Sequence, residues 1–436
     1  MLASARNVQA VLSGRSLSES LPAVPAPLRA ATQAVTFHVM RRFGRAGEIK
    51  RTLVRRTPPN PLLDALLCVA LALLDTAMQT ESGAETPAEA RRDLPVYAVH
   101  TVVDQAVRAA SDEPSMRPYK ALLNAALRRF TRERPAILEQ VLQKPEARWN
   151  HPGWWVRLLR QAYPAQWEPL LAAAGQPGPL TLRVNLRRTG VAALADSLAQ
   201  AGIASQPVGE AGLVLARPRP VHDIPGFGQG LWSVQDAAAQ RAAQLLRPAQ
   251  GERVLDACAA PGGKTAHLLE LADIQLLALD SDAARLQRVG QNLRRLGLDS
   301  DAVALRCADA ADLDAWWDGR QFDAVLADVP CSASGVVRRH PDIRWLRREA
   351  DIARTAALQR RIVQSLWKTV KPGGRMLYAT CSIFPQEGQA QAAWFLSEHE
   401  DAVSMPAPGQ LLPLPEAGGA VSLGDGFFYA LFAKRA

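Results

Sequence analysis

The feature that most constrains the fold is an alternation of short apolar stretches and helical patterns that begins at Arg253. Such alternation is typical of a parallel sheet with helices on both faces, in which ligands bind at the carboxyl ends of the strands. We therefore expect a Rossmann-like, mostly parallel α/β domain over residues 241–436. Its expected strands are 253–258, 274–280, 302–309, 322–328 and 375–381, with a long helix at 358–370 and a possible edge strand within 426–435.

The whole chain has 436 residues, which is enough for two or three domains. In the first part of the chain, apolar residues recur at three- and four-residue spacing, as in 61–75, 96–110 and 119–133. This spacing predicts an all-helical domain over residues 1–143. From 144 to 240, Pro and Trp are frequent, and strand candidates at 180–186 and 213–216 flank a helical stretch at 191–202. We expect a small α+β linking module there.

Charge and cysteine usage limit the class of protein. Lys and Arg exceed Asp and Glu by 51 − 42 = +9, which favours a polyanionic partner. The most apolar run, Leu62 to Leu74, is interrupted by Asp64 and is too short to cross a bilayer, so we expect no membrane association. Five scattered cysteines favour a reducing, cytoplasmic environment, and no cluster has the spacing of a metal site.

A glycine-containing turn follows the first strand of the α/β domain. It reads DACAAPGGKT over Asp256–Thr265, and its glycines let a ligand approach the backbone at a helix N-terminus. A triphosphate-binding loop would need glycine where Cys258 stands, so the turn favours a nucleoside-containing cofactor. Asp280 ends the second strand, where a carboxylate accepts hydrogen bonds from ribose hydroxyls. Asp309 follows the third strand and is the natural partner for an adenine amino group.

Two cysteines leave neighbouring strands at the same edge of the predicted sheet. Cys331 stands in Asp328-Val-Pro-Cys after the fourth strand, and Cys381 stands in Thr-Cys-Ser at the end of the fifth. Adjacent strands lie about 5 Å apart, so both thiols and Asp328 can converge on one site. A thiolate added to carbon 6 of a pyrimidine makes carbon 5 nucleophilic toward a methyl donor, and an acid at N3 stabilises the developing charge. The pattern fits pyrimidine C5-methylation and leaves open which cysteine is the nucleophile.

At these motifs the chain resembles the RsmB (Fmu/Sun) family of bacterial 16S rRNA 5-methylcytosine methyltransferases. The resemblance extends to a NusB-like helical region at the N-terminus and implies a class I methyltransferase fold for the α/β domain. Val329 and Ala237 depart from the family's usual alanine and acidic residue, but neither change removes a group that the chemistry needs. The matching motifs are IPGFGQGLWSVQDAAAQ, DACAAPGGKT, DVPCSASGVVRRHPDIRWLRR, YATCS and DGFFYALFAKR.

The resemblance implies a role for each motif residue. Cys381 is the nucleophile, and Cys331 assists breakdown of the covalent adduct and product release. Asp328 contacts N3 of cytosine, and Lys264 helps to position the base. The implied cofactor is S-adenosylmethionine, and the implied substrate is 16S rRNA that is not yet fully assembled into the small subunit. The implied cofactor-binding residues are Cys258, Ala259, Ala260, Pro261, Gly262, Gly263, Lys264, Asp280, Asp309 and Asp328.

A basic run with an interleaved Trp345 follows Cys331. Arginines bind phosphates and stack on bases, as aromatic rings do, so we expect this run to contact RNA. Its basic residues are Arg338, Arg339, His340, Arg344, Arg347 and Arg348.

Two alternative functions remain. One is a non-catalytic NusB-like RNA-binding or antitermination factor, against which the two thiols, Asp328 and the glycine turn argue. The other is a C5-methyltransferase that acts on tRNA or DNA. We expect a monomer, because the RNA itself can bridge the domains.

Overall fold

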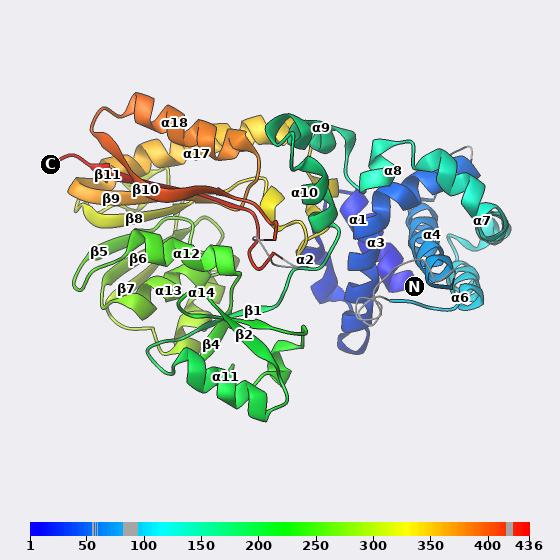
Figure 1. Ribbon diagram of the computed structural model, residues 1–436, viewed down its shortest axis with the longest axis horizontal. Coiled ribbons are helices and arrows are strands. Elements are labelled where there is room, and N and C mark those ends of the chain that lie inside the picture. The colour runs from blue at the N-terminus through cyan, green and yellow to red at the C-terminus, as the bar shows by residue number, and fades with distance from the viewer. Residues whose placement is uncertain (55, 57, 59, 82–94, 416–421) are drawn as a thin grey trace. The chain divides into compact units, whose positions relative to one another are not determined.

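The computed structural model describes residues 1–54, 56, 58, 60–81, 95–415 and 422–436. These residues form two compact units, and the elements of each are labelled in Figure 1. Unit 1 comprises Met1–Gln176 together with Val337–Glu349, and unit 2 comprises Pro177–Val336 and Ala350–Ala436. Unit 1 therefore includes a short segment that the 160 residues 177–336 separate from the rest of it.

Unit 1 is all-helical, as its apolar spacing predicted. Its central helix, α4 (Pro61–Glu81), is long and apolar enough to cross a membrane, but 78% of its most apolar window is buried. That is the environment of a core helix. The helices that pack on α4 are α1 (Leu2–Leu12), α3 (Ala26–Leu53), α6 (Val99–Asp112) and α7 (Lys120–Val141). The shorter helices of unit 1 are α2 (Leu17–Ser20), α8 (Pro145–Trp149), α9 (Gly153–Ala162), α10 (Trp167–Ala174) and α16 (Ile343–Leu346).

Unit 2 contains a small antiparallel sheet with the strand order β2-β3-β1-β4. Strand β1 pairs with a neighbour on each side, and all four of its residues are buried. Helix α11 (Val191–Gln200) packs Leu194 and Leu198 into the same core as Trp232. This is the α+β module that the sequence predicted, with two further strands. The bounds are β1 (Thr181–Val184), β2 (Ser205–Val208), β3 (Gly212–Leu215) and β4 (Trp232–Val234).

The main sheet of unit 2 has seven strands in the order β10-β11-β9-β8-β5-β6-β7. The five strands from β9 to β7 are parallel, which confirms the predicted Rossmann-like class. The chain runs from β5 outward to β7 and then returns to β8 on the other side of β5. Its strands are β5 (Arg253–Asp256), β6 (Gln275–Asp280), β7 (Val303–Cys307), β8 (Phe322–Asp328), β9 (Val370–Thr380), β10 (Ala402–Leu411) and β11 (Phe427–Lys434).

The predicted edge position of the last strand is wrong. Strand β11 lies between β9 and β10, antiparallel to both, and β10 forms the edge. The sequence of β10 contains Pro406 and Pro408, which is why no strand was expected there. Because proline lacks an N–H, an outer strand is the position of a sheet that tolerates it.

Helices cover both faces of the main sheet (Figure 1). One face packs on α12 (Ala237–Leu246), α13 (Gly263–Leu271) and α14 (Ala283–Leu296). The other face packs on α15 (Leu313–Trp316), α17 (Glu349–Thr369) and α18 (Gln389–Glu398). Because both faces are buried, its central strands are apolar throughout, and their polar residues gather at the strand ends.

Candidate active site

Several predicted residues lie at the carboxyl edge of the main sheet. Asp256 ends β5, Asp280 ends β6 and Asp328 ends β8, while Cys381 directly follows β9. In the parallel β8–β9 pair, Asp328 lies opposite Ala379, two residues before Cys381. The chain reverses its direction of travel across the sheet between β5 and β8, and ligands of α/β proteins bind at such a switch point.

The two candidate cysteines meet at this edge. Their sulfur atoms lie 3.5 Å apart, so both thiols can reach the same small group. The hydrogen bond with Cys381 and burial raise the pKa of Cys331 well above its ordinary value, and the charge of Glu387 acts in the same direction. Cys331 is therefore a neutral thiol near pH 7 and holds a proton beside Cys381.

Lys264 and Asp328 form an ion pair in the same unit. Nζ of Lys264 lies 2.6 Å from Oδ2 of Asp328 and 5.3 Å from the ring centroid of Phe427. Burial alone would lower the pKa of Lys264, but the Asp328 carboxylate outweighs burial and the pKa is raised. Lys264 is therefore charged, and the pair offers a proton donor and an acceptor side by side.

The glycine turn is held against β6 and α14. The Ala260 N–H donates to Oδ2 of Asp280 at 3.1 Å. Gly262 has φ +94°, and a Cβ there would lie 3.0 Å from Cγ1 of Val289, so the turn packs on α14 only with glycine at this position. The turn thus brings backbone close to the carboxyl ends of β5 and β6, where a nucleoside would lie.

Arg183 supports this turn from the small sheet, and sequence reasoning missed it. It is fully buried, although arginine is rarely enclosed without partners. Its guanidinium donates to both oxygens of Glu270, at 2.9 and 2.7 Å, to Gln235 and to the carbonyl oxygen of Gly263. The available signal was a single charged residue within the apolar strand pattern LTLRVNL.

Carboxylates at the strand ends fit a ligand that presents hydroxyl and amino groups. Oδ1 of Asp256 is buried and has no hydrogen-bond partner within the described residues, whereas Oδ2 accepts from Thr265 at 2.7 Å. Burial raises the pKa of Asp256 to about 7. Asp280 ends β6 as predicted, and Asp309 follows β7 and pairs with Arg361 at 3.0 Å. Each carboxylate oxygen has two lone pairs, so those with one partner can accept again.

The predicted RNA-contacting run requires a correction, because two of its arginines lie inside unit 1. Arg344 is fully buried, and its guanidinium donates to the carbonyl oxygens of Ala174 at 2.6 Å and Asn150 at 3.4 Å. Burial lowers the pKa of Arg344 to about 9. Arg338 is only 4% exposed. Enclosed guanidinium groups do not reach phosphates, so we assign these two residues to the structure of unit 1.

Trp345 is also a structural residue rather than an open stacking platform. Its ring packs edge to face on Phe43 with 5.1 Å between centroids, and its Nε1–H donates to the carbonyl oxygen of Met40 at 2.8 Å. Asp342 of the same segment accepts the backbone N–H of Leu17 at 2.9 Å. The segment Val337–Glu349 is therefore anchored in unit 1 at several points.

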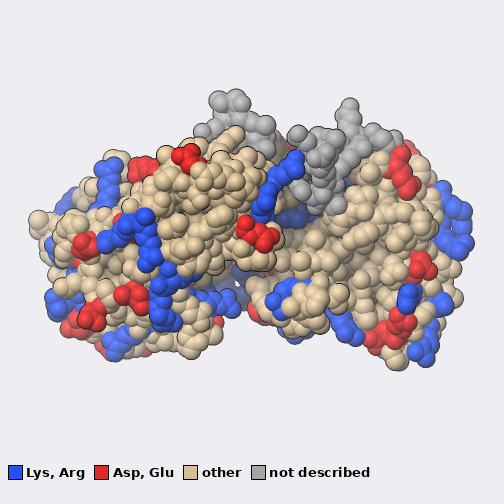
Figure 2. All heavy atoms as spheres, turned by 90° about the horizontal axis from the view of Figure 1, so that it is seen from below, with Lys and Arg blue, Asp and Glu red and all other residues tan. Residues whose placement is uncertain are grey.

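The other members of the basic run are less enclosed. Arg339 and Arg347 are half-buried, and His340 and Arg348 are exposed, so contact between these four residues and RNA stays a prediction. On the face drawn in Figure 2, basic side chains are interspersed with acidic ones.

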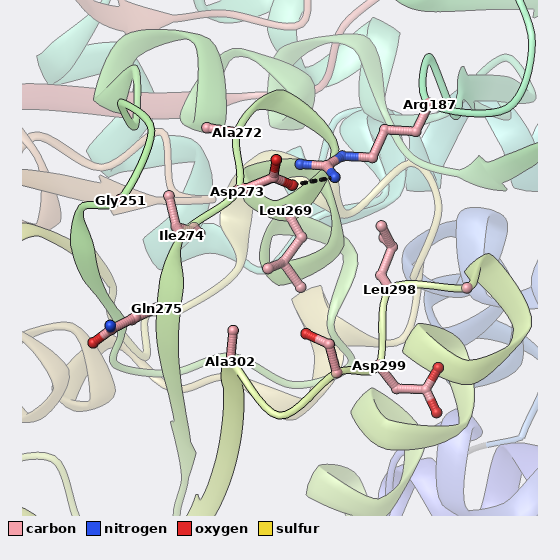
Figure 3. Close-up of a pocket in the computed structure, with 12 residues that line it drawn as sticks. Arg187, Gly251, Leu269, Ala272, Asp273, Ile274, Gln275, Leu298, Asp299 and Ala302 are labelled. Carbon is pink, nitrogen blue, oxygen red and sulfur yellow. Dashed lines mark hydrogen bonds and ion pairs between the residues drawn. The ribbon is translucent and has the colours of Figure 1, made fainter.

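A separate cavity of about 400 Å³ lies at the opposite edge of the main sheet, where β6 and β7 begin (Figure 3). Arg187 and Asp273 face each other across part of it, with Nη1 of the arginine 2.5 Å from Oδ1 of the aspartate. None of the predicted cofactor or catalytic residues lines this cavity. Within the described part of the chain, no group of three or more His, Cys, Asp and Glu residues is arranged to hold a metal ion.

Comparison with known proteins gives consistent matches. Residues 243–433 match the family model for the 16S rRNA methyltransferase RsmB/F, and residues 151–222 match the ferredoxin-like domain of RsmF/B-like methyltransferases. Ribosomal RNA small subunit methyltransferase B of Vibrio cholerae is 41% identical over 98% of this chain and 95% of its own length. The Serratia proteamaculans protein of the same name is 44% identical over 72% of this chain and 73% of its own length.

Solved structures agree with the fold. The crystal structure of PH0851 matches with a TM-score of 0.75 and 25% identity, covering 100% of this chain and 99% of its own. A methyltransferase homologue from Pyrococcus horikoshii matches with a TM-score of 0.57 and 28% identity, covering 66% of this chain and 97% of its own.

Proposed function

The chain belongs to the RsmB/F family of S-adenosylmethionine-dependent rRNA small subunit methyltransferases, and we propose that it methylates carbon 5 of a cytosine in 16S rRNA. The observation that carries this proposal is the pair of thiols, Cys331 and Cys381, with sulfur atoms 3.5 Å apart at the carboxyl edge of the main sheet. Addition and elimination at carbon 6 of a pyrimidine need one thiol as nucleophile and a second polar group beside it.

The strand-end residues fit the cofactor. S-adenosylmethionine, when bound, supplies an electrophilic methyl group. We propose that Asp280 accepts hydrogen bonds from its ribose, that Asp309 contacts its adenine and that Asp328 borders its methyl-bearing end. We propose that the backbone of the glycine turn would hold it. That turn comprises Cys258, Ala259, Ala260, Pro261, Gly262, Gly263 and Lys264.

In the proposed reaction, the thiol proton of Cys381 passes to solvent, Sγ bonds to carbon 6 of the cytosine, and the electron pair of the 5,6 double bond moves to carbon 5, which becomes nucleophilic. The Lys264 ammonium, 2.6 Å from Asp328, passes a proton to that carboxylate, and Asp328 donates it to N3, which neutralises the negative charge that develops in the ring. Lys264 also helps to position the base.

Product release follows methylation. A solvent water takes the proton from carbon 5, the C–H electron pair restores the double bond, and Sγ of Cys381 departs as a thiolate with the electrons of the S–C bond. We assign Cys331 to this step, because its neutral thiol adjoins the departing sulfur.

We propose that the substrate is 16S rRNA before the small subunit is fully assembled. A base must leave any stack to reach Cys381, which costs on the order of a few kcal/mol for a paired base and less in a loop. A loop cytosine in incompletely assembled RNA meets this requirement. We further propose a monomeric cytoplasmic enzyme, with RNA-binding residues 1–143, a linking module at 144–240 and a methyl-transfer domain at 241–436.

The test is transfer of a labelled methyl group from S-adenosylmethionine to unmodified 16S rRNA, followed by digestion to nucleosides. We expect the label in 5-methylcytidine. A bound cofactor without label in this RNA would redirect the assignment to tRNA or DNA. Absence of cofactor binding would favour the non-catalytic RNA-binding alternative.

A further inference from the structure

We propose that Glu387 is a positioning residue that holds the loops of Cys331 and Cys381 at the mutual spacing that adduct formation and release require. This inference rests on the proposed function, because it assigns one cysteine to each step. Glu387 ends a short 3-10 helix, Pro385–Glu387, and is wholly buried. Glu387 is not among the site residues that were predicted from the sequence.

The carboxylate of Glu387 accepts four hydrogen bonds. Oε1 accepts from the backbone N–H of Ser332 at 2.7 Å and from the hydroxyl of Thr355 at 2.6 Å. Oε2 accepts from the hydroxyls of Ser332 at 2.5 Å and Ser382 at 2.6 Å. Four donors match the lone pairs of the two oxygens, so the ionised form is solvated by protein groups in place of water.

Three of these four donor groups belong to the residues that directly follow the cysteines. Ser332 follows Cys331, and Ser382 follows Cys381. The loops are also joined directly, because the Gly335 N–H donates to the carbonyl oxygen of Cys381 at 2.9 Å. A displacement of Glu387 would therefore move both sulfur-bearing residues.

Glu387 is itself fixed to strand β9. Its backbone carbonyl accepts from the hydroxyls of Tyr378 at 2.9 Å and Thr380 at 3.1 Å. Thr380 immediately precedes Cys381, so Glu387 is hydrogen-bonded to the same strand that positions the proposed nucleophile. A buried carboxylate with all its hydrogen bonds made has little freedom to move. Glu387 is therefore suited to fix the distance between the sulfur atoms of Cys331 and Cys381.

An amide cannot replace this carboxylate. Glu387→Gln keeps the shape but substitutes an NH₂ donor for one acceptor oxygen, so donors would face donors. We expect kcat to fall about 100-fold, as displacement of reacting groups by about 1 Å can cause, while KM for RNA and affinity for S-adenosylmethionine stay unchanged. The measurement is steady-state methylation of unmodified 16S rRNA, with cofactor binding determined by calorimetry.

Glu252→Gln is the matched control. Glu252 also accepts several hydrogen bonds, two from Arg375 and one from the Ala249 N–H, but it precedes β5 at the opposite edge of the sheet. We expect this variant to lose stability without a specific fall in kcat. An equal fall in kcat for both variants would attribute the effect to general destabilisation and overturn the inference.

Two milder variants test the loop of Cys381 and the loop of Cys331 one at a time, and they remain informative if Glu387→Gln does not fold. Ser382→Ala should slow covalent attachment to RNA that contains 5-fluorocytosine, in which carbon 5 has no proton to lose and the adduct persists. Ser332→Ala should leave attachment intact and make the adduct on ordinary RNA accumulate, as seen by denaturing gel electrophoresis.

Wild-type rates for attachment and release in both serine variants would overturn the role of Glu387. Failure of the wild-type protein to form 5-methylcytidine would instead overturn the proposed function, and this inference with it. The two failures are therefore distinguished by the wild-type assay alone.

Discussion

At the scale of single residues, the proposed reaction assigns separate roles to the two thiols. Cys381→Ala should abolish methyl transfer, because the neighbouring Cys331 thiol, 3.5 Å away, is kept protonated by burial and is a poor nucleophile. Cys331→Ala should permit transfer but leave protein covalently attached to RNA. Label incorporation and gel electrophoresis under denaturing conditions measure the two outcomes. Cys307→Ala is the control, since Cys307 ends β7 and is exposed; turnover by Cys381→Ala at the control's rate would contradict the assignment.

Asp256 should make stability depend on pH. Burial raises its pKa to about 7, whereas an unfolded aspartate titrates near 3.9. Between about pH 4 and pH 7 the unfolded chain gives up a proton that the folded chain retains, so stability is greatest below this window and falls as pH rises through it.

The variant Asp256→Asn has no ionisable group at this position. We expect its unfolding free energy to decline less between pH 5 and pH 8 than that of the wild type, by about 2 to 4 kcal/mol. Urea unfolding at the two pH values measures the difference. Parallel pH profiles for the two proteins would show that the pKa of Asp256 is not raised.

The position of the candidate site residues at the carboxyl edge of the sheet could be predicted because each follows a strand in a distinctive motif. Arg344 could not be placed in the same way, since its neighbours Arg347 and Arg348 give the segment the composition of an RNA-binding surface. Its burial depends on carbonyl groups of Asn150 and Ala174, which are remote in sequence. Glu387 was missed for a similar reason: its partners come from three separate segments.

At the scale of elements, Arg183 links strand β1 to helix α13. Removal of one partner of a buried ion pair leaves an uncompensated charge, so Arg183→Met should cost about 3 to 5 kcal/mol of stability. It should also weaken binding of S-adenosylmethionine, because Arg183 donates to Gly263 in the glycine turn. Urea unfolding and calorimetry measure the two effects.

The control for this prediction is the double variant Arg183→Met/Glu270→Leu. It removes both charges, which should recover much of the lost stability, because paired buried charges contribute little net stability over apolar groups. If the single variant were as stable as the wild type, the pair between Arg183 and Glu270 would not be formed in solution.

The strands of the parallel sheet could be predicted because burial on both faces makes them apolar throughout. Strand β10 could not, because Pro406 and Pro408 suppress the strand pattern and only one of its residues is buried. Its position depends on pairing with β11 over a register that shifts between Met405 and Gly409. Such long-range pairing leaves little trace in local sequence.

At the scale of the whole molecule, the net charge of +9 predicts that RNA affinity falls with salt. Arg348 is exposed, and its replacement in Arg348→Ala should remove one phosphate contact. The slope of log affinity against log salt should therefore become smaller by about 1. Arg344→Met should leave the slope unchanged and instead lower stability by about 1 to 3 kcal/mol, because buried carbonyl groups lose their donor. Filter binding over a salt series and urea unfolding distinguish the two; a reduced slope for Arg344→Met would contradict its structural assignment.

The division into units could not be predicted from the linear order of the domains. Composition changes near residue 143, but contacts group helices α8 to α10 with the N-terminal helices and add Val337–Glu349 to them. That grouping arises from packing between distant segments, which local apolar spacing does not record.

Synthesis on the ribosome delivers the parts of unit 1 at different times. At about 5 to 20 residues per second, the 160 residues 177–336 take roughly 10 to 30 s to translate. Until then the carbonyl groups of Met40 and Ala174 lack their donors, Trp345 and Arg344. A nascent chain that has completed unit 1 therefore already contains Cys331 but not yet Cys381, so the helical unit is complete before both thiols of the candidate site have been synthesised.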